Sequence, residues 1–219
     1  MQKLANVIVF LGPTGIGKKY WMECVTREFT ATLHIVPTIT TRPLHDSHDR
    51  LFYSFAPESD FLKEETIDDP EEREFWATYE RQGKLGVLYY GFSYGELLSI
   101  PEERCGLIAL SPGHLDTLLL EVRRKMDWLE VAVVRLLSAS QVSDGNDVLS
   151  QNLRRLGYNE EDIKVHGRLA EEFEANTHTI AQKASRVSMA TVYLTGDNEK
   201  DRRAVLEAVH AFCPLPLVG

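Results

Sequence analysis

The sequence predicts an α/β fold in which a mainly parallel sheet is flanked by helices. Apolar runs typical of strands buried on both faces of a sheet recur at residues 7–11, 105–110 and 131–137. Segments with helical periodicity lie between such runs, and strands that alternate with helices are typical of parallel sheets. A glycine-rich turn follows the first run directly, at residues 12–17. Together these observations predict the fold class.

The first unit is a strand, a turn and a helix. The run VIVFL at residues 7–11 predicts the strand, and residues 18–29 predict the helix. Its apolar residues have spacings of one, three and four, which place them on one helical face. They are Trp21, Met22, Val25 and Phe29.

The middle of the chain is more irregular. Residues 34–43 predict a short strand that runs into a polar loop, and residues 51–55 predict a second strand. The acidic residues 57–74 predict a short helix with a solvated break at Pro70. The run VLYYGFS at residues 87–93 leads into a short helix at residues 95–99.

The second half returns to regular alternation. Its expected elements, in chain order, are a strand at 105–110, an amphipathic helix at 114–126, a strand at 131–137, a polar helical stretch at 138–176 with a break at 156–159, a strand at 190–196 and a helix at 198–212.

The length and net charge of the chain limit the classes of function that it can have. A chain of 219 residues fits one domain with a full core. A net charge of −9 argues against nucleic acid as a partner, because phosphate backbones are bound by clustered lysine and arginine. It leaves room for a small phosphorylated ligand held by a local group of arginines.

The expected location is the cytoplasm, without a membrane association. The three cysteines lack the spacing of zinc or redox motifs and suit a reducing compartment. The apolar run near the start is too short for a signal peptide or a membrane span.

The turn predicts a phosphate-binding loop. It satisfies the first seven positions of the eight-residue pattern whose backbone amides bind the phosphates of ATP at the start of a helix. The lysine at the seventh position would reach the outer phosphates. The residues are Gly12, Pro13, Thr14, Gly15, Ile16, Gly17 and Lys18.

The eighth position departs from the pattern. A serine or threonine hydroxyl there normally helps to hold Mg²⁺, whereas this chain has Lys19. A lysine repels a cation if it points inward. If it points to solvent instead, ATP oxygens and water would hold the Mg²⁺. The sequence leaves both orientations open.

Several motifs in order resemble the guanylate kinases among the P-loop nucleoside monophosphate kinases. GPTGIGK resembles their nucleotide loop, and TITTRP at residues 38–43 resembles their phosphate-gripping arginine segment. FYSF at residues 52–55 and LYYG at residues 88–91 resemble their tyrosine-bearing acceptor strands. Residues 152–169 resemble their arginine-bearing lid.

The resemblance implies the site. Lys18, Arg42 and Arg168 would be catalytic, and Arg154 and Arg155 would belong to the lid, although a solvated helix face explains the last two equally well. The residues implied to bind the acceptor are Thr38, Thr40, Arg42, Tyr53, Tyr89 and Tyr90. The tyrosines could also be ordinary half-buried strand residues.

The resemblance also implies subdomains within one domain. The core would comprise residues 1–37, 101–137 and 186–219. Residues 38–98 would bind the acceptor, and residues 138–170 would form the lid.

Neutral residues stand where guanylate kinases place guanine-reading carboxylates. Ala77 and Ser111 are at or nearest these places, and His45 is near the place of a second arginine. Discrimination for guanine should therefore fall. The ribose 1,5-bisphosphate kinases of phosphonate metabolism are similar in lacking the loop hydroxyl and a guanine-reading carboxylate.

Two function hypotheses follow. The first is an ATP- and Mg²⁺-dependent kinase acting on a small phosphate acceptor, with GMP implied by the family and ribose 1,5-bisphosphate as the alternative. The second is a degenerate kinase-like binding module. We expect a monomer or a homodimer, and His45, Asp46, His48 and Asp49 are interpreted as a polar loop in preference to a metal site.

Overall fold

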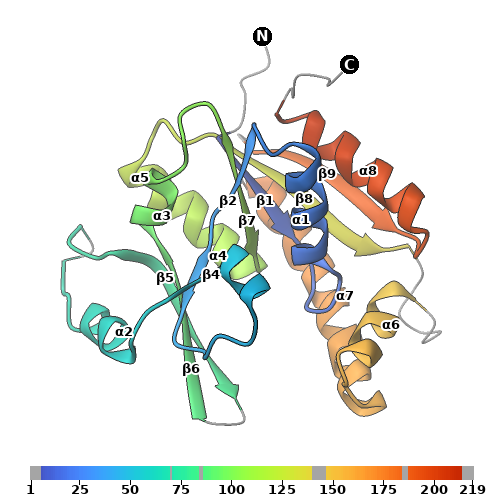
Figure 1. The fold of residues 1–219 in the computed structure, drawn as a ribbon, viewed down its shortest axis with the longest axis horizontal. Coiled ribbons are helices and arrows are strands. Elements are labelled where there is room, and N and C mark those ends of the chain that lie inside the picture. Colours follow the sequence, from blue (N-terminus) through green and yellow to red (C-terminus); the bar gives the residue numbers. More distant parts are fainter. Residues whose placement is uncertain (1–5, 70, 84–85, 140–146, 184–186, 214–219) are drawn as a thin grey trace.

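The central sheet is five-stranded and parallel throughout. The computed structural model describes residues 6–69, 71–83, 86–139, 147–183 and 187–213. The strands are β1 (Val7–Leu11), β2 (Leu33–Ile35), β7 (Cys105–Leu110), β8 (Val131–Ser138) and β9 (Ser188–Leu194). Their order is β2-β7-β1-β8-β9, and every neighbouring pair is parallel (Figure 1). The predicted α/β class with a mainly parallel sheet is confirmed.

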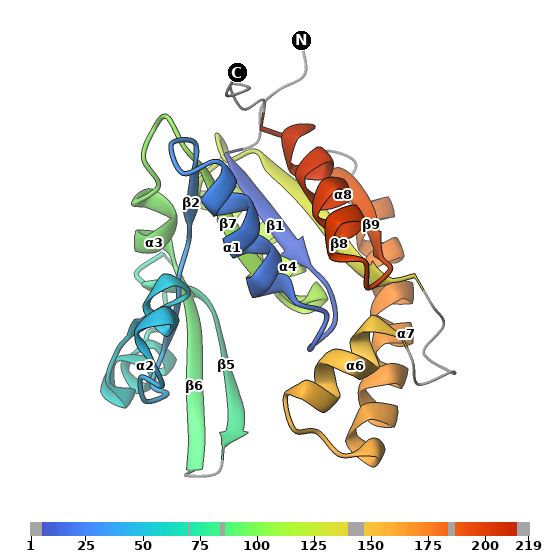
Figure 2. The ribbon, with the colours of Figure 1, turned by 45° about the vertical axis from the view of Figure 1, so that its right-hand side comes forward.

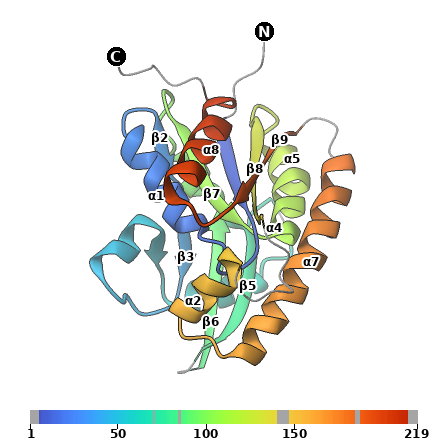
Figure 3. The same cartoon turned by 90° about the vertical axis from the view of Figure 1, so that its right-hand side faces the viewer.

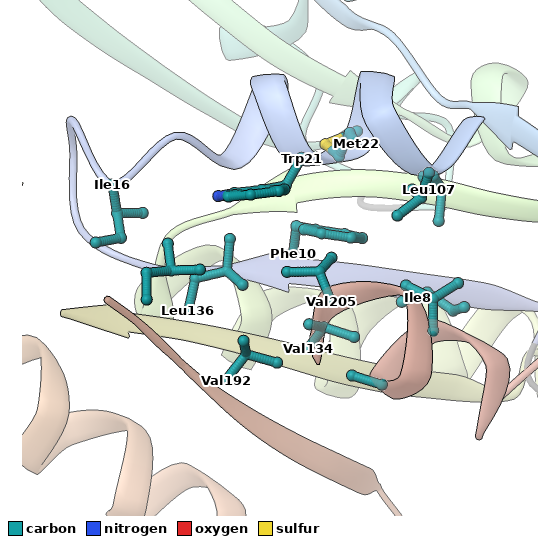
Figure 4. Packing of buried hydrophobic residues seen from close by; sticks show 14 of the residues in the cluster. Ile8, Phe10, Ile16, Trp21, Met22, Leu107, Val134, Leu136, Val192 and Val205 are labelled. Atoms are coloured by element: carbon teal, nitrogen blue, oxygen red, sulfur yellow. The ribbon is translucent and has the colours of Figure 1, made fainter. Parts of the chain in front are cut away.

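Alternate residues of β1 supply the two halves of the core. Ile8 and Phe10 pack under α1 (Lys18–Glu28) and α8 (Asn198–His210), together with Trp21 and Val205 (Figure 4). Successive side chains of a strand point to opposite faces. Val7, Val9 and Leu11 therefore face the other layer, and α1 and α8 together cover one side of the sheet (Figure 2).

The other layer contains α4 (Pro112–Thr117) and α7 (Glu160–Lys183). Leu115 and Phe173 of these helices pack against the odd-numbered residues of β1. The helix predicted at 114–126 is confirmed over residues 112–125, where α4 runs through the π-helical segment Leu118–Val122 into α5 (Arg123–Lys125).

A second sheet is formed by β3 (Thr38–Thr40), β4 (Tyr53–Phe55), β5 (Phe75–Gly83) and β6 (Gly86–Ser93). Its order is β4-β3-β6-β5, with β3 parallel to β4 and antiparallel to β6. The sequence did not predict the long β5–β6 hairpin. The single strand expected in residues 34–43 is two strands, because the chain leaves the central sheet after β2 and enters the second sheet at β3.

The remaining short elements surround this second sheet. Helix α2 (Glu58–Glu65) packs Phe61 against Phe75, with ring centroids 5.0 Å apart. The 3₁₀ helix η1 (Ser47–Leu51) precedes β4, and α3 (Tyr94–Leu98) follows β6.

Helix α6 (Val148–Arg155) packs on the glycine-rich turn. A Cβ atom added to Gly15 would lie 2.7 Å from Leu153 Cδ2, so this helix approaches the loop backbone closely. Figures 2 and 3 show α6 near the end of the sheet where β1 stops. The predicted break at 156–159 separates α6 from α7. Residues 140–146 of the predicted helical stretch lie outside the described residues.

A buried carboxylate joins α2 to β5, which predicts a stability effect. Glu64 accepts hydrogen bonds from the backbone N–H groups of Glu74 and Phe75 at 3.1 Å. We expect Glu64→Ala to lower the free energy of unfolding by about 2 kcal/mol, because two backbone donors, one of them the buried N–H of Phe75, lose a charged acceptor. Glu65→Ala, at an exposed neighbouring position, is the control, and urea unfolding measures both. Equal effects of the two variants would contradict this role.

Candidate functional site

The glycine-rich turn has a tight, partly left-handed backbone. Gly15 and Gly17 have φ angles of +88° and +95°, a left-handed conformation that residues with side chains rarely adopt. A Cβ atom on Gly12 would lie 2.9 Å from the Leu136 carbonyl oxygen. Each glycine is therefore required by the path of the chain, which then enters α1 with Trp21 N–H donating to the Gly17 carbonyl at 3.0 Å.

Lys18 lies against its own loop. Its ammonium donates to the carbonyl oxygens of Gly12 at 2.6 Å and Pro13 at 3.0 Å. Burial lowers the pKa of Lys18 to about 8, and the positive charges of Arg81 and Lys19 lower it further. A phosphate group beside this ammonium would relieve the accumulation of positive charge.

Lys19 points toward the second sheet. Its ammonium donates to the Tyr53 hydroxyl and lies 3.6 Å from the centroid of the Tyr53 ring and 5.5 Å from that of Phe52. Burial, then the neighbouring Arg42, lowers the pKa of Lys19 to about 8. The sequence left open whether Lys19 points to the metal or to solvent. In the structure it points instead to Tyr53 of β4, a strand expected to bind the acceptor.

Arg42 reaches the same tyrosine. Its guanidinium lies 4.6 Å from the Tyr53 ring centroid and forms an ion pair with Asp49. Asp49 also accepts the His45 backbone N–H at 3.1 Å. The structure therefore brings Lys19, Arg42 and Tyr53 into one group, although these residues come from three separate segments. The positive charge of Lys19 also acts on Lys18.

The β5–β6 hairpin adds Arg81 and an aromatic surface to this group. Tyr79 pairs with Tyr90 across the hairpin, and their rings stack with centroids 5.0 Å apart. Tyr90 is 6.4 Å from Tyr53 by ring centroids. Arg81 is two residues after Tyr79 and so lies on the same face of the strand. Its charge lowers the pKa of both lysines.

Sequence reasoning missed Arg81 and Tyr79 because it missed strand β5. Recognising a hairpin closed near residues 83–86 would have placed residues 79 and 81 on the face that carries Tyr90. Burial raises the pKa of the Tyr79 phenol, which keeps it in the neutral, hydrogen-bonding form.

The aromatic surface extends to the end of β7. His114 lies 4.6 Å from Tyr79 and 5.3 Å from Phe92 by ring centroids. Its Nδ1 atom is 3.0 Å from the Ser111 hydroxyl oxygen. Burial lowers the pKa of His114, so its imidazole is neutral at pH 7. Neutral groups, with Ser111 among them, thus line this part of the surface.

Other residues expected in the site lie elsewhere or have structural contacts. Tyr89 faces α2, with its ring 5.7 Å from Phe61, because it alternates with Tyr90 along β6. The Thr40 hydroxyl donates to the Tyr89 carbonyl at 2.8 Å and accepts from the Arg42 backbone N–H at 3.1 Å, so it positions the start of the Arg42 loop. Thr38 is half-buried opposite Tyr53 in the register.

The arginines expected in the lid are paired with another residue or exposed. Arg154 pairs with Glu160 at 2.7 Å, which links α6 to α7, and Arg155 is exposed. Arg168 is exposed on α7, whose opposite side buries Ile163 and Gly167. These positions are consistent with the alternative of a solvated helix face.

The described residues offer little to a metal ion. Among them, no group of three or more histidine, cysteine, aspartate or glutamate side chains is arranged to hold one. Asp46 caps η1 by accepting the N–H groups of His48 and Asp49, as expected of a polar loop. Because Lys19 offers no oxygen at the eighth loop position, the usual protein ligand for Mg²⁺ is missing there. No helix in the described part of the chain combines the length and apolar character needed to cross a bilayer.

Comparison with known proteins identifies the fold. By sequence, neither a known protein family nor a curated protein matches this chain. By structure, a guanylate kinase from Anaplasma phagocytophilum aligns over 96% of this chain and 87% of its own, with a TM-score of 0.52 and 14% identity. A gluconokinase from Sinorhizobium meliloti 1021 aligns over 97% and 96% with a TM-score of 0.44 and 14% identity. The likeness to the guanylate kinase shows a shared fold.

The buried lysine predicts a pH effect. We expect an NMR titration of the Lys18 side chain to give a midpoint near pH 8, below the ordinary value of 10.5. Since the folded pKa is the lower one, the folded protein releases this proton first, and stability rises with pH from about 8 to 10.5. The gain in stability over Lys18→Met should grow across that window. A midpoint above pH 10 would contradict the burial of this ammonium.

Proposed function

We propose that this protein is an ATP-dependent phosphotransferase that moves the γ-phosphoryl group of ATP onto the phosphate of a small acceptor. The observation that supports it is that Lys18 lies on the phosphate loop while its neighbour Lys19 meets Arg42 at Tyr53. A donor site and an acceptor site for phosphate groups would then be adjacent. The kinase fold agrees with this arrangement.

The chemistry needs positioning and positive charge more than a protein nucleophile. The acceptor phosphate would attack the γ-phosphorus in line, so the side chains hold two anions together against their repulsion. Lys18 would exchange its loop carbonyls for the outer phosphates of ATP. Arg42 would exchange Asp49 for the acceptor phosphate, whose oxygens match the guanidinium fork.

ATP fits the loop, while Mg²⁺ would be held differently from the usual pattern. With Lys19 directed to Tyr53, no hydroxyl of the eighth position would coordinate the ion. ATP oxygens and water would hold it, and it would supply further neutralisation of phosphate charge.

The acceptor we propose is GMP or a related phosphorylated small molecule. The family resemblance points to GMP. The neutral surface of Tyr79, Tyr90, His114 and Ser111 lacks the charge that reads guanine in that family, so it also suits ribose 1,5-bisphosphate.

A binding module is the second candidate. The observation that favours it is the position of the lid arginines: Arg154 is paired with Glu160 and Arg168 is exposed on α7. A module that senses a nucleotide or docks a protein would not need these charges at a transferring phosphoryl group.

Turnover assays test the proposed function. ADP release from Mg-ATP should occur with one of GMP, AMP, UMP, CMP or ribose 1,5-bisphosphate. Lys18→Met should lower kcat/KM by about 100-fold or more, because transition-state charge loses its nearest cation. Lys200→Met, on the exposed side of α8, should leave it unchanged. Silence with every acceptor from a folded protein would favour the binding module.

A second variant tests whether Arg42 binds the acceptor or the donor, ATP. Arg42→Met should raise the KM for the acceptor by roughly 10- to 100-fold, since a charge-assisted phosphate contact is lost. The affinity for ATP should stay within about twofold, because Arg42 is not part of the loop. Arg50→Met, exposed on the nearby η1, is the matched control. An equal loss of ATP affinity would show that Arg42 serves the donor.

A further inference from the structure

Lys18 and Lys19 diverge from the start of α1. Successive residues of a helix are about 100° apart around its axis, so neighbouring side chains leave in different directions. Lys18 turns back to the carbonyls of Gly12 and Pro13, and Lys19 extends to β4. The last residue of the loop therefore faces away from the loop's own anion-binding backbone.

The Lys19 ammonium is surrounded by aromatic and charged side chains from several elements. Phe52 and Tyr53 lie beneath its ammonium, and Arg42 and Asp49 approach from the loop after β3. From β5, Arg81 adds a further positive charge. The negative charge of Asp49 is already paired with Arg42, so the positive charges here exceed the negative ones.

Tyr53 brings the two cations to one place. Its hydroxyl accepts from Lys19, and its ring lies under the Arg42 guanidinium at 4.6 Å. A phosphate beside this hydroxyl would present two oxygens to the planar fork of Arg42 and a third to the ammonium of Lys19. The arrangement complements a tetrahedral dianion better than it does the Mg²⁺ of the usual loop.

We propose that Lys19 binds the phosphate of the acceptor together with Arg42, so that the final residue of the phosphate loop serves the acceptor and not the metal. The inference rests on the proposed function, which it deepens by naming a residue that determines acceptor binding. Lys19, which replaces the usual serine or threonine of the eighth loop position, would then contribute to acceptor binding in an active enzyme.

Binding to a nucleotide-filled protein tests this without turnover. The loop is first saturated with Mg-AMPPNP, so that added inorganic phosphate cannot occupy the donor site. An NMR titration of ¹⁵N-labelled protein then gives the dissociation constant for phosphate. Lys19→Met removes the charge at similar length, Lys19→Arg keeps it, and Lys200→Met is the surface control. Thermal unfolding confirms that each variant is folded.

We expect Lys19→Met to weaken phosphate binding about tenfold, the effect of losing one charged hydrogen bond, with AMPPNP affinity changed by less than about twofold. Lys19→Arg should retain most of the phosphate affinity, and Lys200→Met all of it. Unchanged phosphate binding in Lys19→Met, with tighter Mg-AMPPNP binding, would overturn the inference and place Lys19 against the metal.

Two outcomes with the unsubstituted protein separate this inference from the proposed function. If it binds Mg-AMPPNP but no phosphate, the role of Lys19 is refuted while the donor site stands. If it binds neither, the phosphotransferase proposal fails with it.

Discussion

The repulsion among positive charges gathered beside the phosphate loop is the constraint on which the site depends. Lys19 and Arg42 meet at Tyr53, and the charge of Arg81 acts on both Lys18 and Lys19. Both lysines have a pKa of about 8 because burial and these neighbouring charges disfavour the charged form. The chain tolerates this by pairing Arg42 with Asp49 and by directing Lys18 to loop carbonyls. In the proposed function, phosphate oxygens replace these contacts.

The fold arranges this convergence from distant parts of the chain. β1 and α1 supply the loop lysines, the segment around β3 and β4 supplies Arg42 and Tyr53, and the β5–β6 hairpin supplies Arg81 and Tyr79. The central sheet fixes the loop through the alternating core residues of β1, while α6 packs Leu153 on Gly15. In the proposed function, ATP would bind at the loop of the central sheet, and the acceptor phosphate would bind beside Arg42 and Tyr53 of the second sheet. Transfer of a phosphoryl group requires these two ligands to be adjacent.

The sequence predicted the loop and the parallel sheet because both have strong local signals: glycine spacing and apolar strands of fixed length. It did not predict the direction of Lys19, since rotation of a side chain on the first helical turn depends on Tyr53, which is 34 residues away. Arg81 was missed because β5 has polar residues on one face and no apolar run. Tyr89 was grouped with Tyr90, although a strand turns neighbours to opposite faces, and the exposed position of Arg168 depends on which side of α7 packs inward.

The most direct measurement is a crystal structure with Mg-AMPPNP and tungstate, a tetrahedral oxyanion that anomalous scattering locates without ambiguity. Our account predicts tungstate oxygens at about 3 Å from Arg42 and Lys19, the ordinary hydrogen-bond distance, with the γ-phosphate on Lys18. Tungstate bound away from Tyr53, or Lys19 turned to the nucleotide's metal, would contradict the claim that this cluster is the acceptor site.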